Sequence, residues 1–354
     1  MSGGPTQPAS ASRREFLQQC GTTLAVAAGV GAAGLLLHNR PGRRGPGTPA
    51  ALRLKNYFAR IDYGPSDPRI SIAQGLDVTK TVRAALEPIG GMKRFVRIGD
   101  VVLLKPNVAF DRPPSMAATT SPEVVAAVVR LCREAGAKKV IVADNPIESP
   151  EGCFAKTGIK AAAEAAGAVV MLPSPAHFRT IAVRDHPPDR ARNEILGSWP
   201  TFWRPLAEAD KLIGLPVVKD HNLCYASMGL KNWYGLLGGR RNQFHQAIHD
   251  IVSDLGYMIS PTLVIVDGTR VLMRNGPTGG RLQDVRIANT VVASVDQIAA
   301  DAWCYQHLLR RDPAGLKYLE LAERKFGAPG APQRFGQRDW QAYQRQGLIR
   351  QTKL

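Results

Sequence analysis

The sequence lacks the closely spaced cysteines of metal-binding and redox proteins. It contains five cysteines in 354 residues, and no two of them form a Cys-x-x-Cys pair. A zinc ribbon or a ferredoxin-type cluster needs such spacing, so we expect no iron–sulfur cluster. Cys132 and Cys304 each lie in an apolar helical pattern that favours buried thiols, although an oxidising compartment leaves disulfide pairing open.

Signatures of several enzyme and binding classes are also missing. There is no Gly-x-Ser-x-Gly nucleophile elbow, no His-Glu-x-x-His zinc motif and no glycine-rich nucleotide fingerprint. Cys224 follows His221 by three residues, and this spacing alone is weak support for a catalytic thiol. The absence of a helix-turn-helix, a zinc finger or an aromatic RNA-binding signature argues against nucleic acid as a partner.

Acidic residues are scarce relative to basic ones. The chain has 46 Lys and Arg against 29 Asp and Glu, a formal net charge of +17. Residues 324–354 contain seven basic residues and only Asp339 as an acidic one. Outside the cytoplasm, such a surface can attract a small anionic ligand or, through the C-terminal stretch, the cell envelope. A solvated basic surface is the alternative.

The first 38 residues have the order of a targeting segment. Arg13 and Arg14 are followed by Glu15 and a Phe-Leu pair, which matches the twin-arginine pattern, and residues 20–37 are apolar and uncharged. We therefore expect the twin-arginine machinery to export the protein to the periplasm or the outer face of the inner membrane. Retention as an uncleaved anchor stays open, because a membrane span needs only about 17 to 25 residues.

The rest of the chain divides into three expected parts. Residues 39–52 form a linker rich in Pro, Gly and Arg. Residues 53–310 form the main domain, and residues 311–354 form a basic helical C-terminal extension.

Apolar periodicity in the main domain predicts strands that alternate with helices. Residues 101–104 are a short apolar run, Ser121 and Pro122 suit an N-cap and a first helical position, and residues 139–143 are the next run. Further strands are expected at 168–172, 211–216, 263–266 and 291–294, and further helices at 155–166, 228–237, 242–255 and 296–309. This order predicts an α/β fold, with a mostly parallel sheet and helices on both faces.

Polar residues follow three of the expected strands, at Lys105, Asp144 and Asp267. In open parallel sheets, ligands bind outside the carboxyl ends of the strands. The sequence therefore predicts a ligand cleft at the strand ends.

A series of motifs between residues 100 and 305 resembles the domain of unknown function 362 family. The pieces occur in order as KPN (105–107), TTSPEVV (119–125), GAKKVIVADNP (136–146), VKDH (218–221), GLKNWYG (229–235), His245, DL (254–255), VDGTRVLMRNGPTGG (266–280) and SVDQIAADA (294–302). Many members look like iron–sulfur proteins because a cysteine-rich, ferredoxin-like segment follows the domain. This chain departs from that arrangement, since only Cys304 follows Asp301.

The lysines of these motifs are candidates for an anion site. Lys105, Lys219 and Lys231 can bind phosphate or carboxylate through their ammonium groups. The neighbouring polar candidates are Asn107, Thr120, Ser121, Asp144 and Asn232. The amino end of the helix after Ser121 adds backbone N–H donors. The alternative is that the lysines are solvated and that Thr120 and Ser121 only cap the helix.

A divalent metal is a second hypothesis for the same cleft. Imidazole and carboxylate groups suit such an ion, and His221, His245 and Asp267 are the candidate ligands. His245 and His249 stand four residues apart without the glutamate of a zinc protease motif. Hydrogen-bonded structural histidines and aspartates are the alternative.

The sequence is compatible with two functions. One is an exported protein that binds, and as an enzyme transforms, a small anionic ligand at the strand ends. In that case Lys105 or Lys231 acts as an electrophilic or acid/base group, and Asp267 acts as a base or metal ligand. The other is a non-catalytic binding or maturation protein of the cell envelope. A metal or cofactor that survives purification would favour the first.

Replacing Arg13 and Arg14 together by Lys should leave the protein in the cytoplasm, because the export receptor reads the two guanidinium groups. Cell fractionation followed by immunoblotting measures this. Normal export of the variant would contradict the assignment of the targeting segment.

Overall fold

The computed structural model describes residues 52–182, 196–327 and 335–354. The expected targeting segment and all of the linker before Leu52 lie outside these residues. None of the helices in the described part of the chain is long and apolar enough to cross a membrane.

The centre of the structure is a ten-stranded sheet. Its strands are β1 (Ile70–Gln74), β2 (Val101–Pro106), β3 (Lys139–Val142), β4 (Val169–Val170), β7 (Lys211–Leu215), β8 (Val217–His221), β9 (Tyr225–Ser227), β10 (Leu263–Leu272), β11 (Val285–Ser294) and β12 (Ile349–Lys353). The order is β12-β1-β11-β10-β7-β2-β3-β4, and β8 pairs with β10 and β9. The run from β10 to β4 is parallel, whereas β11 is antiparallel to both of its neighbours. A separate antiparallel pair contains β5 (Phe178–Ala182) and β6 (Ser198–Phe202).

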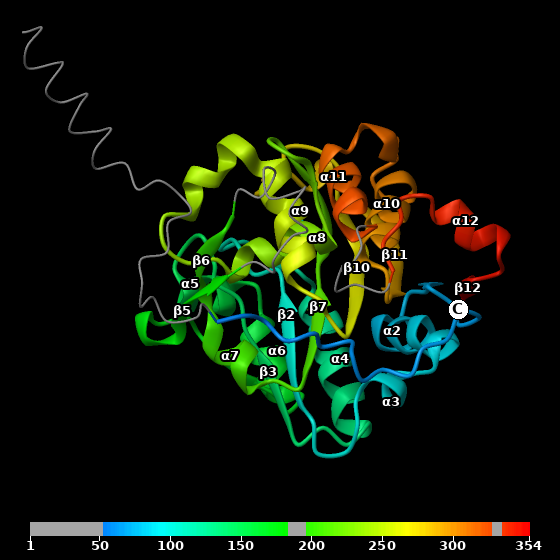
Figure 1. Ribbon diagram of the computed structural model, residues 1–354, viewed down its shortest axis with the longest axis horizontal. Coiled ribbons are helices and arrows are strands. Elements are labelled where there is room, and N and C mark those ends of the chain that lie inside the picture. The colour runs from blue at the N-terminus through cyan, green and yellow to red at the C-terminus, as the bar shows by residue number, and fades with distance from the viewer. Residues whose placement is uncertain (1–51, 183–195, 328–334) are drawn as a thin grey trace, which may run out of the picture. The chain divides into compact units, whose positions relative to one another are not determined.

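Helices cover both faces of the sheet, as predicted (Figure 1). One face carries α2 (Val78–Leu86), α3 (Met92–Phe95), α4 (Pro122–Glu134), α5 (Pro150–Lys156) and α6 (Ile159–Ala165). The other carries α7 (Trp203–Glu208), α8 (Gly229–Asn232), α9 (Ile248–Met258), α10 (Gln297–His307), α11 (Lys317–Phe326) and α12 (Trp340–Arg345). Alternation along β2 supplies both apolar clusters, since Leu103 belongs to one and Val102 and Leu104 to the other. The mostly parallel α/β fold is therefore confirmed.

Several elements differ from the sequence prediction. The helix expected at 228–237 forms α8 and then a 3-10 segment at Trp233–Leu236, and the strand expected at 291–294 begins at Val285. The strand expected to end before Asp267 continues to Leu272, because β11 pairs with it along this length. The helix expected at 155–166 is divided into α5 and α6 at Gly158, whose φ of 71° interrupts the helix. The helix expected from 242 begins instead with a 3-10 segment, η6 (Arg241–Ala247), before α9.

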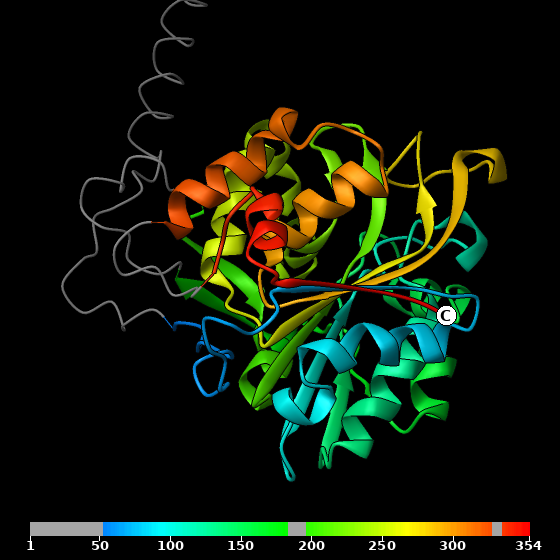
Figure 2. The same ribbon diagram turned by 90° about the vertical axis from the view of Figure 1, so that its right-hand side faces the viewer.

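The C-terminal segment, expected to form a helical extension, also contributes a strand. β12 pairs in parallel with β1, with Ile349 opposite Ile70 (Figure 2). Upstream, α11 packs against α9 and buries Lys325, which forms an ion pair with Asp254 and donates to Ser253 Oγ at 2.6 Å. One of the basic residues of this segment is thus part of the protein interior.

Lys325→Ala should lower the free energy of unfolding by about 3–5 kcal/mol, because it leaves the buried carboxylate of Asp254 without its cation. Lys317→Ala, at an exposed position of the same helix, is the matched control. Combining Lys325→Met with Asp254→Asn should recover part of the loss, since no buried charge then stays unpaired. Chemical denaturation measures all three. Equal stability of the two alanine variants would contradict a structural role for the ion pair.

Candidate functional site

A cavity of about 250 Å³ lies at the carboxyl ends of β2, β3 and β8. The predicted residues that line it are Lys105, Asn107, Asp144, Lys219, His221, Lys231, Asn232 and His245. They come from four places in the fold: β2 and the loop after it, the end of β3, β8, and the α8–η6 region. The parallel order of the strands brings these distant positions together. We refer to this cavity as the lysine pocket.

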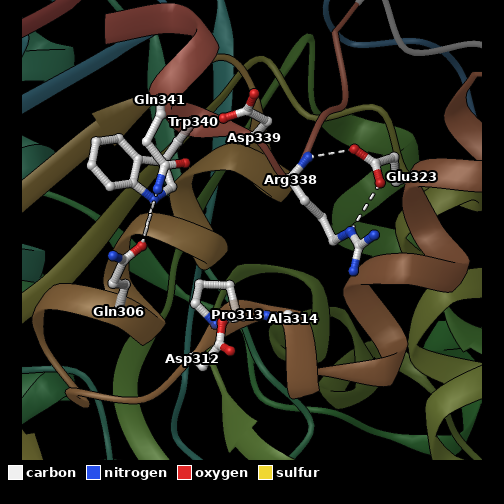
Figure 3. A pocket seen from close by; sticks show the side chains of 9 residues that line it. All are labelled: Gln306, Asp312, Pro313, Ala314, Glu323, Arg338, Asp339, Trp340 and Gln341. Carbon is white, nitrogen blue, oxygen red and sulfur yellow. Dashed lines mark hydrogen bonds and ion pairs between the residues drawn. The ribbon is translucent and has the colours of Figure 1, made fainter.

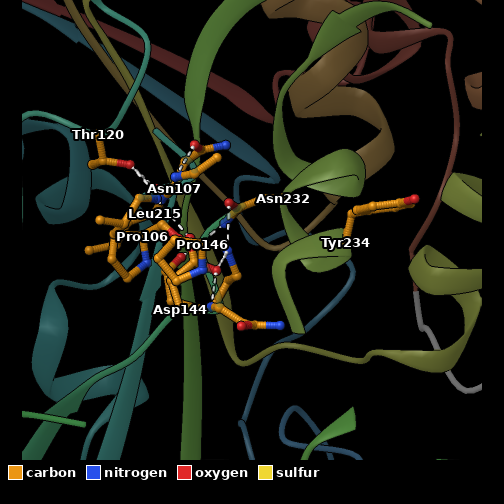
Figure 4. A network of polar contacts seen from close by, with 12 residues as sticks. Pro106, Asn107, Thr120, Asp144, Pro146, Leu215, Asn232 and Tyr234 are labelled. Atoms are coloured by element: carbon orange, nitrogen blue, oxygen red, sulfur yellow. Dashed lines mark hydrogen bonds and ion pairs between the residues drawn. The ribbon is translucent and has the colours of Figure 1, made fainter. Parts of the chain in front are cut away.

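Lys105 is held by a buried polar network at the base of the lysine pocket. Its Nζ lies 2.6 Å from Asp144 Oδ1 and donates to the Pro106 carbonyl at 2.7 Å and to Asn232 Oδ1 at 3.1 Å. Asn232 in turn donates from Nδ2 to the Lys105 carbonyl at 2.9 Å. Asn107, Asp144 and Asn232 are labelled in this network in Figure 4. Burial lowers the pKa of Lys105, and Asp144 opposes that shift.

Asp144 also joins the ends of two strands. Its Oδ2 accepts from the Val108 backbone N–H at 2.7 Å, and its Oδ1 accepts from the Asn145 N–H at 2.9 Å. Gly235 lies against the ion pair so closely that a Cβ there would overlap Asp144 Oδ1 and Lys105 Nζ. The backbone therefore closes one side of the pair.

Lys219 is buried beside an aromatic ring. Its Nζ donates to the Ala118 carbonyl and to Asn107 Oδ1 at 3.3 Å, and it lies 4.9 Å from the centre of the Phe110 ring. Burial, followed by the nearby charge of Lys231, lowers the pKa of Lys219 to about 7. Part of the lysine population is therefore neutral at physiological pH.

Lys231 has the least satisfied ammonium group of the lysine pocket. Its Nζ lies 3.9 Å from the centre of the Tyr234 ring, and among the described residues it makes no hydrogen bond or ion pair. Burial lowers its pKa to about 8, with further lowering from Arg241 and Lys105. A buried cation without a carboxylate partner is costly, and an anionic ligand would offset that cost.

Arg241 is the main lining residue for which the sequence predicted no role. Within the described ranges, its guanidinium donates only to backbone carbonyls, including Leu237 at 3.0 Å, Asn145 at 2.9 Å and Pro146 at 2.7 Å. The basic turn at 238–241 was visible in the sequence, but two of the carbonyls that hold Arg241, those of Asn145 and Pro146, come from a distant loop. Arg241 adds a fourth cation to the lining.

The two histidines of the lysine pocket are predominantly neutral at physiological pH. Burial and then Lys231 and Lys219 lower the pKa of His221 to about 2, and its Nδ1 accepts from the Leu223 N–H at 3.2 Å. Burial also lowers the pKa of His245, whose ring stacks on Tyr234 with centroids 6.0 Å apart. Neither side chain therefore offsets or adds to the charge of the lysines.

No group of three or more His, Cys, Asp or Glu side chains placed to hold a metal occurs in the described ranges. A metal bound by His221 and His245 stays a prediction. The described cysteines, Cys132, Cys153, Cys224 and Cys304, are buried and free, as the sequence favoured for two of them.

Asp267, Thr120 and Ser121 are not among the residues that line the lysine pocket. Asp267 is buried within β10, where Oδ2 accepts from the Ser121 N–H at 2.7 Å and Oδ1 accepts from Thr269 Oγ1 at 2.6 Å. Thr120 Oγ1 accepts from the Asn107 N–H at 2.8 Å and donates to the Leu215 carbonyl at 2.6 Å. The catalytic or metal-binding role expected of Asp267 stays a prediction: its carboxylate lies at the amino end of α4, where an external anion was expected.

Basic side chains outnumber acidic ones in the lysine pocket. Lys105, Lys219, Lys231 and Arg241 face Asp144 as the one carboxylate among the lining residues. Such a site can hold an anion and, through Lys219 and Lys231 with pKa values of about 7 and about 8, donate or accept a proton near neutral pH.

A second cavity, of about 360 Å³, lies among α10, α11 and α12 (Figure 3). Its charged residues have partners within the chain: Arg338 pairs with Glu323 at 2.9 Å, Asp339 pairs with Arg345 at 2.7 Å, and Asp312 accepts from the Ala314 N–H at 2.9 Å. Because these charges are satisfied locally, the lysine pocket is the stronger candidate for a site.

A curated relative and a family profile agree with the sequence motifs. The chain is 31% identical over 252 residues to Thylakoid-associated protein sll1697 of Synechocystis, which covers 69% of this chain and 74% of that protein. A crystal structure of a Thermotoga maritima protein matches with a TM-score of 0.34 and 12% identity, over 71% of this chain and 60% of that one. The profile of the family described as Domain of unknown function (DUF362) matches residues 102–306. This chain therefore belongs to the DUF362 family.

Proposed function

We propose that this protein binds a small anion in the lysine pocket. The observation that carries the proposal is the buried ammonium group of Lys231, which has no carboxylate partner among the described residues and stands beside three further cations. A bound anion would satisfy this group and reduce the repulsion among the four positive side chains.

The proposal places this activity outside the cytoplasm. The twin-arginine pattern at Arg13 and Arg14 supports export to the periplasm or the outer face of the inner membrane. The name of the Synechocystis relative, which describes a thylakoid-associated protein, is compatible with a location beside a membrane.

The basic C-terminal stretch is a weaker candidate for contact with the envelope. Of its described basic residues, Arg324, Lys325, Arg338 and Arg345 form ion pairs within the chain. Less of its charge is therefore available to a partner than the sequence alone indicates.

If the protein is an enzyme, Lys231 is the better candidate for acid/base chemistry. Its pKa of about 8 lies near neutral pH, and its ammonium group is not already held by a carboxylate. Lys105 is tied to Asp144 and Asn232, so it would position the anion and stabilise its charge. A non-catalytic binding protein would use the same contacts without turnover.

Lys231→Met should weaken sulfate binding at least about tenfold, because a hydrogen bond to a charged group contributes about 1.5–3 kcal/mol. Isothermal titration calorimetry with sodium sulfate measures the affinity. The melting temperature should not fall, since Met fills a similar volume and removes a buried charge. Lys160→Met, at an exposed position of α6, is the matched control and should bind like the unmodified protein. Absence of sulfate binding in the unmodified protein, or equal affinity of the two variants, would count against the proposal.

Sulfate affinity should fall at least about tenfold between pH 6 and pH 9. Sulfate stays a dianion over this range, whereas Lys219 and Lys231, with pKa values lowered to about 7 and about 8, lose their protons as the pH rises. Binding favours the protonated lysines, so it should take up protons at pH 8. Calorimetry in buffers of different ionisation enthalpy detects this uptake. An affinity that stays constant or increases with pH would show that these lysines do not hold the anion.

A further inference from the structure

We propose that the anion recognised by the lysine pocket carries an apolar portion, so that the ligand is a small amphipathic anion. Its charged group would lie at the lysines, and its apolar portion would extend over Ile147 and Leu223. This inference rests on the proposed function and names the chemical class of its ligand.

The lysine pocket has two chemically different parts. The ammonium groups of Lys105, Lys219 and Lys231 provide the charged part. The apolar lining residues are Ala109, Phe110, Ile147, Leu223 and Pro277. An inorganic anion would use only the first part, and a neutral apolar molecule would leave the lysines without a partner.

Ile147 and Leu223 are exposed at the lining of the cavity. Their side chains are 54% and 44% exposed, although each would gain from burial against an apolar group. They lie on different loops, Ile147 after β3 and Leu223 between β8 and β9. Two exposed aliphatic side chains thus meet the same cavity from separate parts of the chain.

Hydrogen bonds from the backbone N–H groups of Ile147 and Leu223 hold the two loops at these positions. The Ile147 N–H donates to the Ala109 carbonyl at 3.1 Å, and the Leu223 N–H donates to His221 Nδ1 at 3.2 Å. Ala109 and His221 themselves line the pocket. The apolar surface is therefore built from the same loops as the charged site.

Single exposed apolar side chains are common on protein surfaces and need no explanation of their own. Leu76 is 87% exposed and is not among the residues that line the lysine pocket. Ile147 and Leu223 differ from Leu76 because they line a cavity whose basic side chains outnumber its acidic ones. Leu76 consequently serves as a control position.

Calorimetric titration with methyl, butyl and hexyl sulfate, each below its micelle concentration, tests the inference. These probes share one charged group and differ only in chain length. Affinity should increase about three- to fourfold for each methylene that becomes buried. The double variant Ile147→Ser/Leu223→Ser should lose most of the gain between methyl and hexyl sulfate and keep its affinity for inorganic sulfate. Leu76→Ser should match the unmodified protein for every probe.

The outcomes separate this inference from the proposed function. If inorganic sulfate binds through Lys231 but chain length has no effect, the apolar portion is refuted and the anion site survives. If no sulfate of any kind binds, the proposed function fails as well. A chain-length effect that persists in the double variant would also overturn the assignment to Ile147 and Leu223.

A membrane surface is the competing use of the two exposed side chains. Sedimentation with phosphatidylglycerol vesicles distinguishes it. If the double variant loses vesicle binding while its alkyl sulfate affinities stay unchanged, Ile147 and Leu223 serve membrane contact and the inference is wrong. Unchanged vesicle sedimentation together with a reduced chain-length effect would support it.

Discussion

The buried ion pair between Lys105 and Asp144 is the interaction on which the organisation of the lysine pocket depends. Asp144 accepts from the backbone after β2 and from its own loop, and Lys105 extends the network to Asn232 on α8. This pair thus connects the ends of β2 and β3 with α8, which packs on one face of the sheet. Asp144 is the one carboxylate among the lining residues, and it pairs with Lys105. The other cations of the cavity therefore have no counter-charge among its lining residues.

Local sequence patterns predicted the parts of this arrangement that depend on local structure. The apolar runs before Lys105 and Asp144 form β2 and β3, and polar residues after buried parallel strands meet at one edge of the sheet. Ser121 precedes α4 as expected, although its hydroxyl makes no cap hydrogen bond. An apolar run also preceded Lys219, whereas Lys231 and His245 came from the family resemblance, because periodicity alone would not have connected their positions in the fold.

Long-range pairing accounts for what the sequence did not predict. Asp267 followed an apolar run just as Asp144 did, but antiparallel pairing with β11 extends its strand and places its carboxylate at the start of α4. The amide of Ser121 is therefore occupied by a residue of the chain itself. Arg241 was missed for a similar reason, since the Asn145 and Pro146 carbonyls that hold it are remote in sequence. Charge at the cavity is consequently supplied by side chains rather than by a helix terminus.

Gly235 lies so close to the Lys105–Asp144 ion pair that the geometry of the pair depends on the absence of a side chain at this position. A methyl group at this position would overlap both charged atoms, so the chain could accommodate it only by separating Lys105 from Asp144 or by moving the segment that follows α8. The residue before Gly235 is Tyr234, whose ring lies beside Lys231, so movement of this segment would also bear on Lys231. The absence of a side chain at Gly235 is therefore a steric condition for the ion pair, and through the pair it bears on the charge of the cavity.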